Sequence, residues 1–442
     1  MKKVKRRAWA ALVIALAVAL GMCVYVCRFA NEHDQWVSFS ANQHIYSGGA
    51  LTIGTVTDRN GVELAGSADG ARTYAADAAT RIACLHAVGD TGGNIGTGAL
   101  TAFANRLAGY SVVGGVSGTG GTVTLSIDER LNRVAYEALA GRSGAVLLCD
   151  YTTGELLCMV SSPSYDPLVG FDADNSYYDG VYLNRALSAA YAPGSVFKLV
   201  TLVAALENID DLYARSFVCI GSTEVDGNTI TCSGVHGTQT IEQALANSCN
   251  CAFAELSLEL GGGTLEAYAA RFGLTESQSI NGIATAAGSF EAAADGSAEL
   301  AWSGIGQSTD LVCPVTFLRY VSAIANGGVA AGQSLLSGEG GGSDRLLSAD
   351  TADKLRSMMN YNVVYAYGTD RFPGLTLCAK SGTAEVGDGS SHAWFAGFLD
   401  DTEHPYAFVV VVEHGGGGLS NAGPVANAVL QAAGAGEEVS YD

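Results

Sequence analysis

The stretch Tyr191-Ala192-Pro193-Gly194-Ser195-Val196-Phe197-Lys198 decides which fold is expected for this chain. It places a serine in the first turn of an apolar helix, predicted over 195–206, with a lysine three residues later. Because positions i and i+3 share a helix face, the Ser195 hydroxyl and the Lys198 amine can meet. Burial and the positive end of a helix lower a lysine pKa, which lets the amine take the serine proton. Such pairs also occur by chance, so this one alone is weak evidence for catalysis.

A second polar segment, Ala246-Asn247-Ser248-Cys249-Asn250, lies between helices predicted over 241–247 and 251–260. Ser248 at this break can relay a proton, and Asn250 can bind an amide carbonyl. Ordinary helix-cap and turn residues are the alternative interpretation. The segment therefore gains meaning only in combination with the serine-lysine pair.

The third segment, Cys378-Ala379-Lys380-Ser381-Gly382-Thr383-Ala384-Glu385, follows a predicted strand. Lys380 and two hydroxyls there can receive a carboxylate, while Gly382 allows a ligand backbone to approach closely. A solvated strand end with a glycine turn is the alternative. The three segments occur in the order S-x-x-K, S-x-N and K-[ST]-G, each in the expected local structure, and this order is the stronger evidence.

This order is the signature of penicillin-binding proteins and class A β-lactamases. From about Asp58 to its end, the chain resembles a class B (monofunctional) penicillin-binding protein, a peptidoglycan D,D-transpeptidase. Further matching segments are Asp58-Arg59-Asn60-Gly61, Ser162-Pro163-Ser164-Tyr165-Asp166-Pro167, Gly304-Ile305-Gly306-Gln307 followed by Cys313-Pro314, and Trp394-Phe395-Ala396-Gly397.

The resemblance implies an α+β fold of the penicilloyl-serine-transferase (β-lactamase-like) type. In that fold an antiparallel sheet is flanked by helices, and a helical subdomain borders the site. The resemblance also implies transpeptidation of peptidoglycan stem peptides that end in D-Ala-D-Ala, and acylation by β-lactams. It implies that Ser195 attacks the penultimate D-Ala carbonyl, that Lys198 takes its proton, and that Ser248 with Lys380 returns a proton to the leaving D-Ala.

The same resemblance implies roles in substrate binding. Asn250 would hold the substrate peptide, and Ser381, Gly382 and Thr383 would receive its terminal carboxylate. The backbone N–H groups of Ser195 and Thr383 would form the oxyanion hole. The family usually has threonine where this chain has Ser381, a change that keeps the hydroxyl.

Other functions remain as alternatives at this point. A β-lactamase or carboxypeptidase would let water reach the acyl-enzyme, and a β-lactam-sensing or non-catalytic penicillin-binding membrane protein would lack useful turnover. No glycosyltransferase region is expected before Thr122, so a separate SEDS-type glycosyltransferase is the expected partner. Division, elongation and sporulation stay open as the cellular role.

The N-terminus predicts a membrane anchor. Five basic residues precede an uncharged apolar run over 8–27 that is long enough to cross a bilayer, and basic flanks stay cytoplasmic. We expect a cytoplasmic tail over 1–7, a transmembrane helix over 8–27, a small β-containing pedestal over 31–121 and an extracytoplasmic transpeptidase domain over 122–442. A cleaved signal peptide or a lipidated Cys23 is the alternative.

Net charge and the spacing of cysteines and histidines argue against nucleic-acid binding and against a metal site. The net charge of −21 disfavours nucleic-acid binding, because an acidic surface repels phosphates. Eleven cysteines are present, and Cys219 and Cys232 form one candidate local disulfide. No cofactor is expected, and no metal site, because CxxC, HxxxH and HExxH spacings do not occur.

Periodicity predicts the remaining elements. A helix capped by Asp128 is expected to run to about Ala140, followed by a hairpin of strands over 144–150 and 155–161. Later come helices over 314–326, 349–360 and 424–433 and strands over 375–380, 393–399 and 406–413. Strands at both ends of this region suggest one sheet closed by distant segments.

Overall fold

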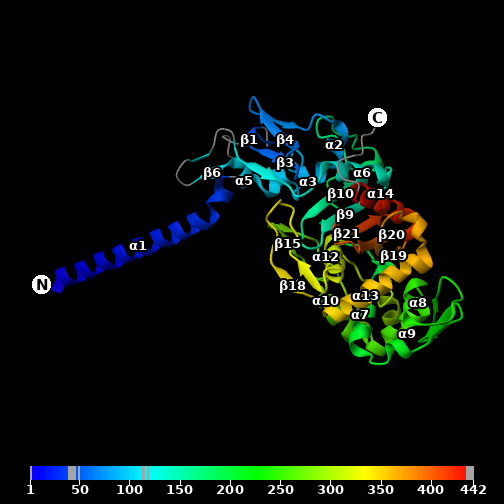
Figure 1. Cartoon of the computed structure of the whole chain (residues 1–442). Helices are drawn as coiled ribbons and strands as arrows, with labels where there is room; N and C mark the ends of the chain where they lie inside the picture. Colours follow the sequence, from blue (N-terminus) through cyan, green and yellow to red (C-terminus); the bar gives the residue numbers. More distant parts are fainter. Residues whose placement is uncertain (1, 38–45, 48–49, 112–114, 117–119, 435–442) are drawn as a thin grey trace.

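A five-stranded antiparallel sheet forms the centre of the molecule (Figure 1). The computed structural model describes residues 2–37, 46–47, 50–111, 115–116 and 120–434. The strand order is β10-β9-β21-β20-β19. The strands are β9 (Gly144–Asp150), β10 (Leu156–Ser162), β19 (Leu377–Glu385), β20 (Ser391–Leu399) and β21 (Tyr406–Val412). Because β9 pairs with β21, the two distant halves of the chain close one sheet, as predicted.

Both faces of this sheet are buried, because alternate side chains of its strands enter two different cores. In β9, Ala145 and Leu147 belong to one core and Val146 and Leu148 to the other. Two helices contribute to the second core, α6 (Glu129–Leu139) and α14 (Gly423–Gly434), which lie together in Figure 1. The first core continues into the helical subdomain, whose helix α12 (Pro314–Ala325) is buried along its length. The implied α+β fold is confirmed.

The helical subdomain lies between β10 and β19 in the chain. Its helices are α7 (Lys198–Asn208), α8 (Ile241–Ala246), α9 (Asn250–Leu260), α10 (Gly262–Arg271), α11 (Ala298–Ser303), α12 and α13 (Ala349–Asn362). Short strands that periodicity did not predict pair within it: β11 (Phe217–Cys219) with β14 (Gly237–Gln239), β12 (Ser222–Val225) with β13 (Asn228–Thr231), β15 (Ser279–Ile280) with β16 (Ile283–Ala284), and β17 (Val329–Ala331) with β18 (Ser343–Arg345). They are too short for an alternating pattern to be distinctive.

The N-terminal module contains a four-stranded sheet of order β5-β4-β3-β8. Its strands are β3 (Thr55–Thr57), β4 (Glu63–Ala68), β5 (Ala71–Tyr74) and β8 (Thr122–Thr124). Strand β8 begins at Thr122 and pairs with β3 in parallel. The domain boundary predicted between residues 121 and 122 therefore separates β8 from the other strands of this sheet. The rest of the module has the short elements β1 (Tyr46–Ser47), β2 (Ala50–Leu51), α2 (Ala78–Ala83), α3 (Leu85–Val88), α4 (Ala99–Ala102), α5 (Ala104–Ala108), β6 (Tyr110–Ser111) and β7 (Gly115–Val116). Parts of the predicted 31–121 module lie outside the described residues.

Helix α1 (Lys2–Val37) projects away from the rest of the molecule (Figure 1). Its segment Lys2–Phe29 is long and apolar enough to cross a membrane, with a mean hydropathy of 2.6. The helix thus continues ten residues beyond the predicted span 8–27. A single N-terminal apolar helix of this kind is compatible with a membrane-anchored protein.

The buried Asp58 joins the N-terminal sheet to helix α6, which packs against the central sheet. One carboxylate oxygen accepts hydrogen bonds from the backbone N–H groups of Asn60 and Val62, both at 2.8 Å, which forms the predicted Asp58–Gly61 turn. The other accepts from the N–H of Glu129 at 3.2 Å, in the first turn of α6. One side chain therefore closes a hairpin and fixes the start of a helix.

Replacing Asp58→Ala should lower the free energy of unfolding by about 2–3 kcal/mol, because three backbone donors lose a buried acceptor. Thermal or urea unfolding of the purified chain in detergent measures this loss. The control is Asp174→Ala, since Asp174 is an exposed loop residue. Equal stability of the two variants would contradict the role given to Asp58.

Candidate active site

Ser195 lies in a short 3₁₀ turn, Gly194–Val196, directly before α7. The turn is fixed from two sides. The Gly194 N–H donates to the Gly306 carbonyl at 2.8 Å, and the Trp394 indole N–H donates to the Ala192 carbonyl at 2.9 Å. The serine is half-buried, while its neighbours Gly194 and Val196 are fully enclosed. The predicted helix 195–206 is thus found as this turn followed by α7.

Strand β19 packs against the Ser195 turn at the distance that two glycines permit. Gly194 has φ +56°, and a Cβ at this position would lie 2.6 Å from the Thr383 carbonyl oxygen. A Cβ on Gly382 would lie 2.8 Å from the Pro193 carbonyl oxygen. Gly382 therefore lets the protein's own serine turn approach β19, whereas the sequence had suggested approach by a ligand.

Lys198 is completely buried, and its amine has three oxygen partners. Its Nζ donates to the Ser248 carbonyl at 2.6 Å, to the Asn250 Oδ1 at 2.8 Å and to the Ser248 Oγ at 3.2 Å. Burial lowers the pKa of Lys198 from 10.5 to about 7, because the charged amine has lost its hydration. A substantial fraction of this amine is therefore neutral near neutral pH and able to accept a proton.

Lys380 reaches the same hydroxyl from the sheet. Its Nζ donates to the Ser248 Oγ at 3.0 Å and to the Ser381 carbonyl at 2.9 Å, and the side chain is completely buried. Burial, reinforced by the positive charge of Lys198, lowers the pKa of Lys380 well below its usual value. Within the described part of the chain, no carboxylate lies within 4.0 Å of either amine. Ser248 therefore links two buried lysines that do not favour being charged together.

The Ser248 segment has the break predicted from the sequence. Helix α8 ends at Ala246, α9 begins at Asn250, and Ser248 between them has φ +51°. The Asn250 side chain accepts from Lys198 and donates to the Thr231 carbonyl at 2.8 Å. One amide hydrogen of Asn250 remains for a ligand, because its Nδ2 carries two.

Tyr367 and Gln307 complete the strand side of the site. The Ser381 N–H and hydroxyl donate to the Tyr367 hydroxyl oxygen at 2.9 and 3.2 Å, and Tyr367 is buried. The Gln307 side chain donates to the Thr383 carbonyl at 3.0 Å. Gln307 lies in a segment that carried the resemblance, whereas no sequence signal pointed to Tyr367. A hydroxyl brought to β19 by the helical turn Val363–Tyr367 is a purely tertiary contact.

These groups line or border a cavity of about 480 Å³. Five of the eight predicted site residues line it: Ser195, Ser248, Asn250, Ser381 and Thr383. Lys198 and Lys380 lie behind its wall, hydrogen-bonded to Ser248, and Gly382 is buried against the serine turn. Sequence reasoning missed the further lining residues Thr231, Cys232, Ser233, Trp302 and Glu385. A larger cavity of about 700 Å³ around Arg271 and Arg319 contains none of the predicted residues.

The arrangement consists of a half-buried serine directly before a helix, a buried lysine one turn on, and a serine shared with a second lysine. It is the arrangement expected of serine acyltransferases of the S-x-x-K class. The family model of the penicillin-binding protein transpeptidase domain matches residues 144–431 of this chain. The chain belongs to this family.

The relatives are similar over most of this chain. The peptidoglycan D,D-transpeptidase PbpA of Mycobacterium tuberculosis is 30% identical over 379 residues, which cover 76% of each chain. The penicillin G acyl-enzyme of M. tuberculosis penicillin-binding protein A has a TM-score of 0.71 at 26% identity, covering 86% of this chain and 99% of that one. The D,D-transpeptidase domain of a peptidoglycan glycosyltransferase from Eggerthella lenta has a TM-score of 0.73 at 28% identity, covering 86% and 97%.

Replacing Gly194→Ala should separate the serine turn from β19, because the new Cβ would clash with the Thr383 carbonyl. We expect a loss of about 2 kcal/mol or more in stability, together with much slower labelling by a fluorescent penicillin. Gly170→Ala is a matched control, since Gly170 has φ +81° but no atom within 4 Å of an added Cβ. It should lose only about 1 kcal/mol from backbone strain and keep its labelling. Equal losses in both variants would show that the close approach is unimportant.

Proposed function

We propose that this chain catalyses D,D-transpeptidation of peptidoglycan stem peptides through an acyl-enzyme on Ser195. The observation that supports this most is the Ser248 hydroxyl within hydrogen-bonding distance of both buried lysines, beside the cavity that contains Ser195. Membership in the transpeptidase family and the similarity to a D,D-transpeptidase support the same reaction. β-Lactams are expected to acylate Ser195, and the similar M. tuberculosis penicillin-binding protein A forms an acyl-enzyme complex with penicillin G.

In the proposed mechanism, Lys198 acts as the base for Ser195. The lysine follows the serine by one helical turn, and its lowered pKa provides the neutral amine that the step requires. The Ser195 oxygen bonds to the penultimate D-Ala carbonyl carbon while its proton moves to Lys198 Nζ. Ser248 and Lys380, which share a hydrogen bond, then deliver a proton to the leaving D-Ala amine. An amine from a second stem peptide takes the acyl group and restores the Ser195 hydroxyl.

The other predicted residues would orient the substrate. Asn250 has one amide hydrogen left for the substrate peptide, and Ser381 and Thr383 line the cavity where the terminal carboxylate would lie. The N–H groups of Ser195 and Thr383 would bind the oxyanion, since Gly194 and Gly382 let their segments approach closely. Donors of this kind typically contribute about 3 kcal/mol each to the transition state.

We also propose that α1 anchors the enzyme in the cell membrane as a single-pass helix with a cytoplasmic N-terminus. The basic residues at the start of α1 support this orientation. The catalytic domain would then face the extracytoplasmic space, where stem peptides are cross-linked. A separate SEDS-type glycosyltransferase is the proposed source of the glycan strands, as the family resemblance implies.

Ser195→Ala should abolish labelling by a fluorescent penicillin, because the acylated oxygen is removed. Labelling of the full chain in detergent, followed by gel fluorescence, measures this, with the exposed Ser176→Ala as control. The time course of label release then distinguishes a transpeptidase from a β-lactamase. A transpeptidase should hold the label for many minutes, whereas release within seconds would indicate a β-lactamase. Unchanged labelling of Ser195→Ala would overturn the site.

Acylation should accelerate as pH rises through about 7. Below this pH Lys198 is protonated and cannot accept the serine proton, so the rate should fall up to tenfold per pH unit. Lys198→Arg should stay inactive at every pH tested, since a guanidinium keeps its proton. The measurement is the acylation rate from about pH 5 to 9, with thermal stability recorded at each pH. A rate independent of pH across this range would contradict Lys198 as the base.

A further inference from the structure

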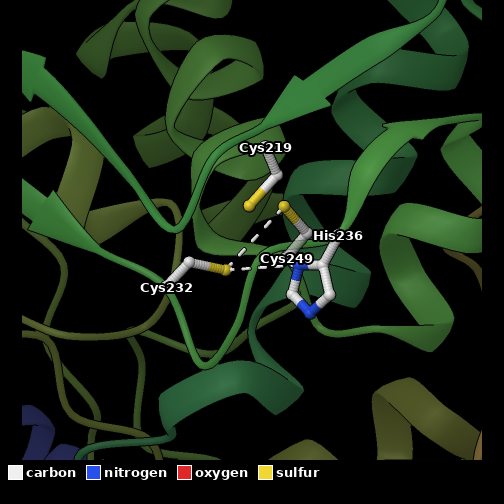
Figure 2. A group of neighbouring side chains, drawn as sticks. All are labelled: Cys219, Cys232, His236 and Cys249. Atoms are coloured by element: carbon white, nitrogen blue, oxygen red, sulfur yellow. Dashed lines mark hydrogen bonds between the residues drawn. The ribbon is translucent and has the colours of Figure 1, made fainter.

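Four metal-ligating side chains converge beside the active site, although no short motif joins them. They are Cys219 at the end of β11, Cys232 after β13, His236 before β14 and Cys249 before α9. Figure 2 shows the three sulfur atoms and a ring nitrogen of His236 turned toward one shared space. One potential ligand atom from each residue lies within 4.8 Å of all the others.

The spacing fits a tetrahedral metal site. Bonds of about 2.3 Å to sulfur and 2.0–2.1 Å to nitrogen place neighbouring sulfurs about 3.8 Å apart, and sulfur and nitrogen about 3.6 Å apart. The Cys232 and Cys249 sulfurs are 3.9 Å apart, and the Cys232 sulfur lies 3.5 Å from His236 Nδ1. A disulfide needs about 2.05 Å. The candidate Cys219–Cys232 disulfide is not formed, because both cysteines are free.

We propose that Cys219, Cys232, His236 and Cys249 bind one zinc ion. Three sulfurs and one imidazole suit zinc, which prefers four-coordinate sites with these ligands. On binding, each cysteine gives up its thiol proton and bonds to the metal as a thiolate. Three thiolates and Zn²⁺ leave one net negative charge. This proposal replaces the expectation of no metal site, which depended only on the absence of short motifs.

The surroundings suit a structural ion. Cys219 and Cys249 are fully buried, whereas Cys232 and His236 are partly exposed, which leaves a path for the metal to enter. The Asn250 N–H donates to the Cys232 sulfur at 3.2 Å, a contact that stabilises a thiolate. A fifth sulfur, Cys251, lies 3.6 Å from that of Cys219 but is outside the group of four. Cys251 therefore provides a matched control.

The ion would also position catalytic groups, a consequence that rests on the proposed function. Cys249 lies between Ser248 and Asn250 in the chain, and Cys232 lines the active-site cavity. A metal bound to both cysteines would tie the segment after β13 to the start of α9. Ser248 and Asn250 would then be fixed relative to Lys198. Positioning, without contact to the substrate, is the role proposed for the four ligands.

The test is the zinc content of the full chain, isolated in detergent without added reductant or chelator and measured by mass spectrometry of the metal. We expect about one zinc per chain in the wild type and in Cys251→Ser. Cys219→Ser and His236→Ala should bind zinc at least tenfold more weakly and should therefore be isolated with less zinc per chain. Zinc-free wild type, or ligand variants that bind as tightly as Cys251→Ser, would overturn the proposal. Recovery of a Cys232–Cys249 disulfide from the isolated chain would overturn it too.

Cobalt substitution covers the case in which the ligand variants fail to fold. Wild-type chain stripped of zinc and loaded with Co²⁺ should show thiolate-to-cobalt charge-transfer absorption and the visible bands of a tetrahedral ion. Spectra of octahedral cobalt without charge transfer would contradict the ligand set. Removing zinc should slow penicillin acylation at least tenfold, and added zinc should restore it. Ser195→Ala should still bind one zinc, so the metal site and the proposed reaction can fail separately.

Discussion

The Ser248 hydroxyl, shared between the amines of Lys198 and Lys380, is the contact on which the site depends. It joins three parts of the molecule, namely the start of α7, the break between α8 and α9, and strand β19. Each lysine is buried without a carboxylate within 4.0 Å among the described residues. Hydrogen bonds stabilise both amines, and the Lys198 amine also lies over the Phe253 ring, 5.5 Å from its centroid. Burial of this kind destabilises the charged form of each amine, and this destabilisation lowers the pKa values of both lysines.

Close backbone packing makes this contact attainable. Gly194 and Gly382 let the serine turn lie directly on β19, and Gly306 lets its own segment approach the same turn. An added Cβ on any of the three would fall within 2.8 Å of a backbone oxygen. The sheet therefore has two roles. Its two covered faces give the domain a rigid centre, and the edge strand β19 supplies one wall of the cavity that contains Ser195.

The proposed zinc site would order the part of the cavity lining that contains Cys232. The short strand pairs β11–β14 and β12–β13 place only four side chains in the core, Phe217, Cys219, Val225 and Ile230, and two-stranded pairs of this length are marginally stable by themselves. A bound metal would hold them against α9, next to the segment that carries Ser248 and Asn250. Stability of the subdomain and geometry of the active site would then depend on one ion.

The sequence by itself determined the local features: the S-x-x-K turn, the α6 helix capped by Asp128, the β9–β10 hairpin and the strands near the C-terminus. These follow from residue spacing and from caps and turns, which act over a few residues. Only the tertiary structure decided which side chains meet. Ser248 contacts partners 50 and 132 positions away, Tyr367 reaches Ser381, and four ligands spread over 219–249 converge. Such contacts follow from packing between elements that are distant in the chain, and the spacing of residues along the chain does not determine that packing.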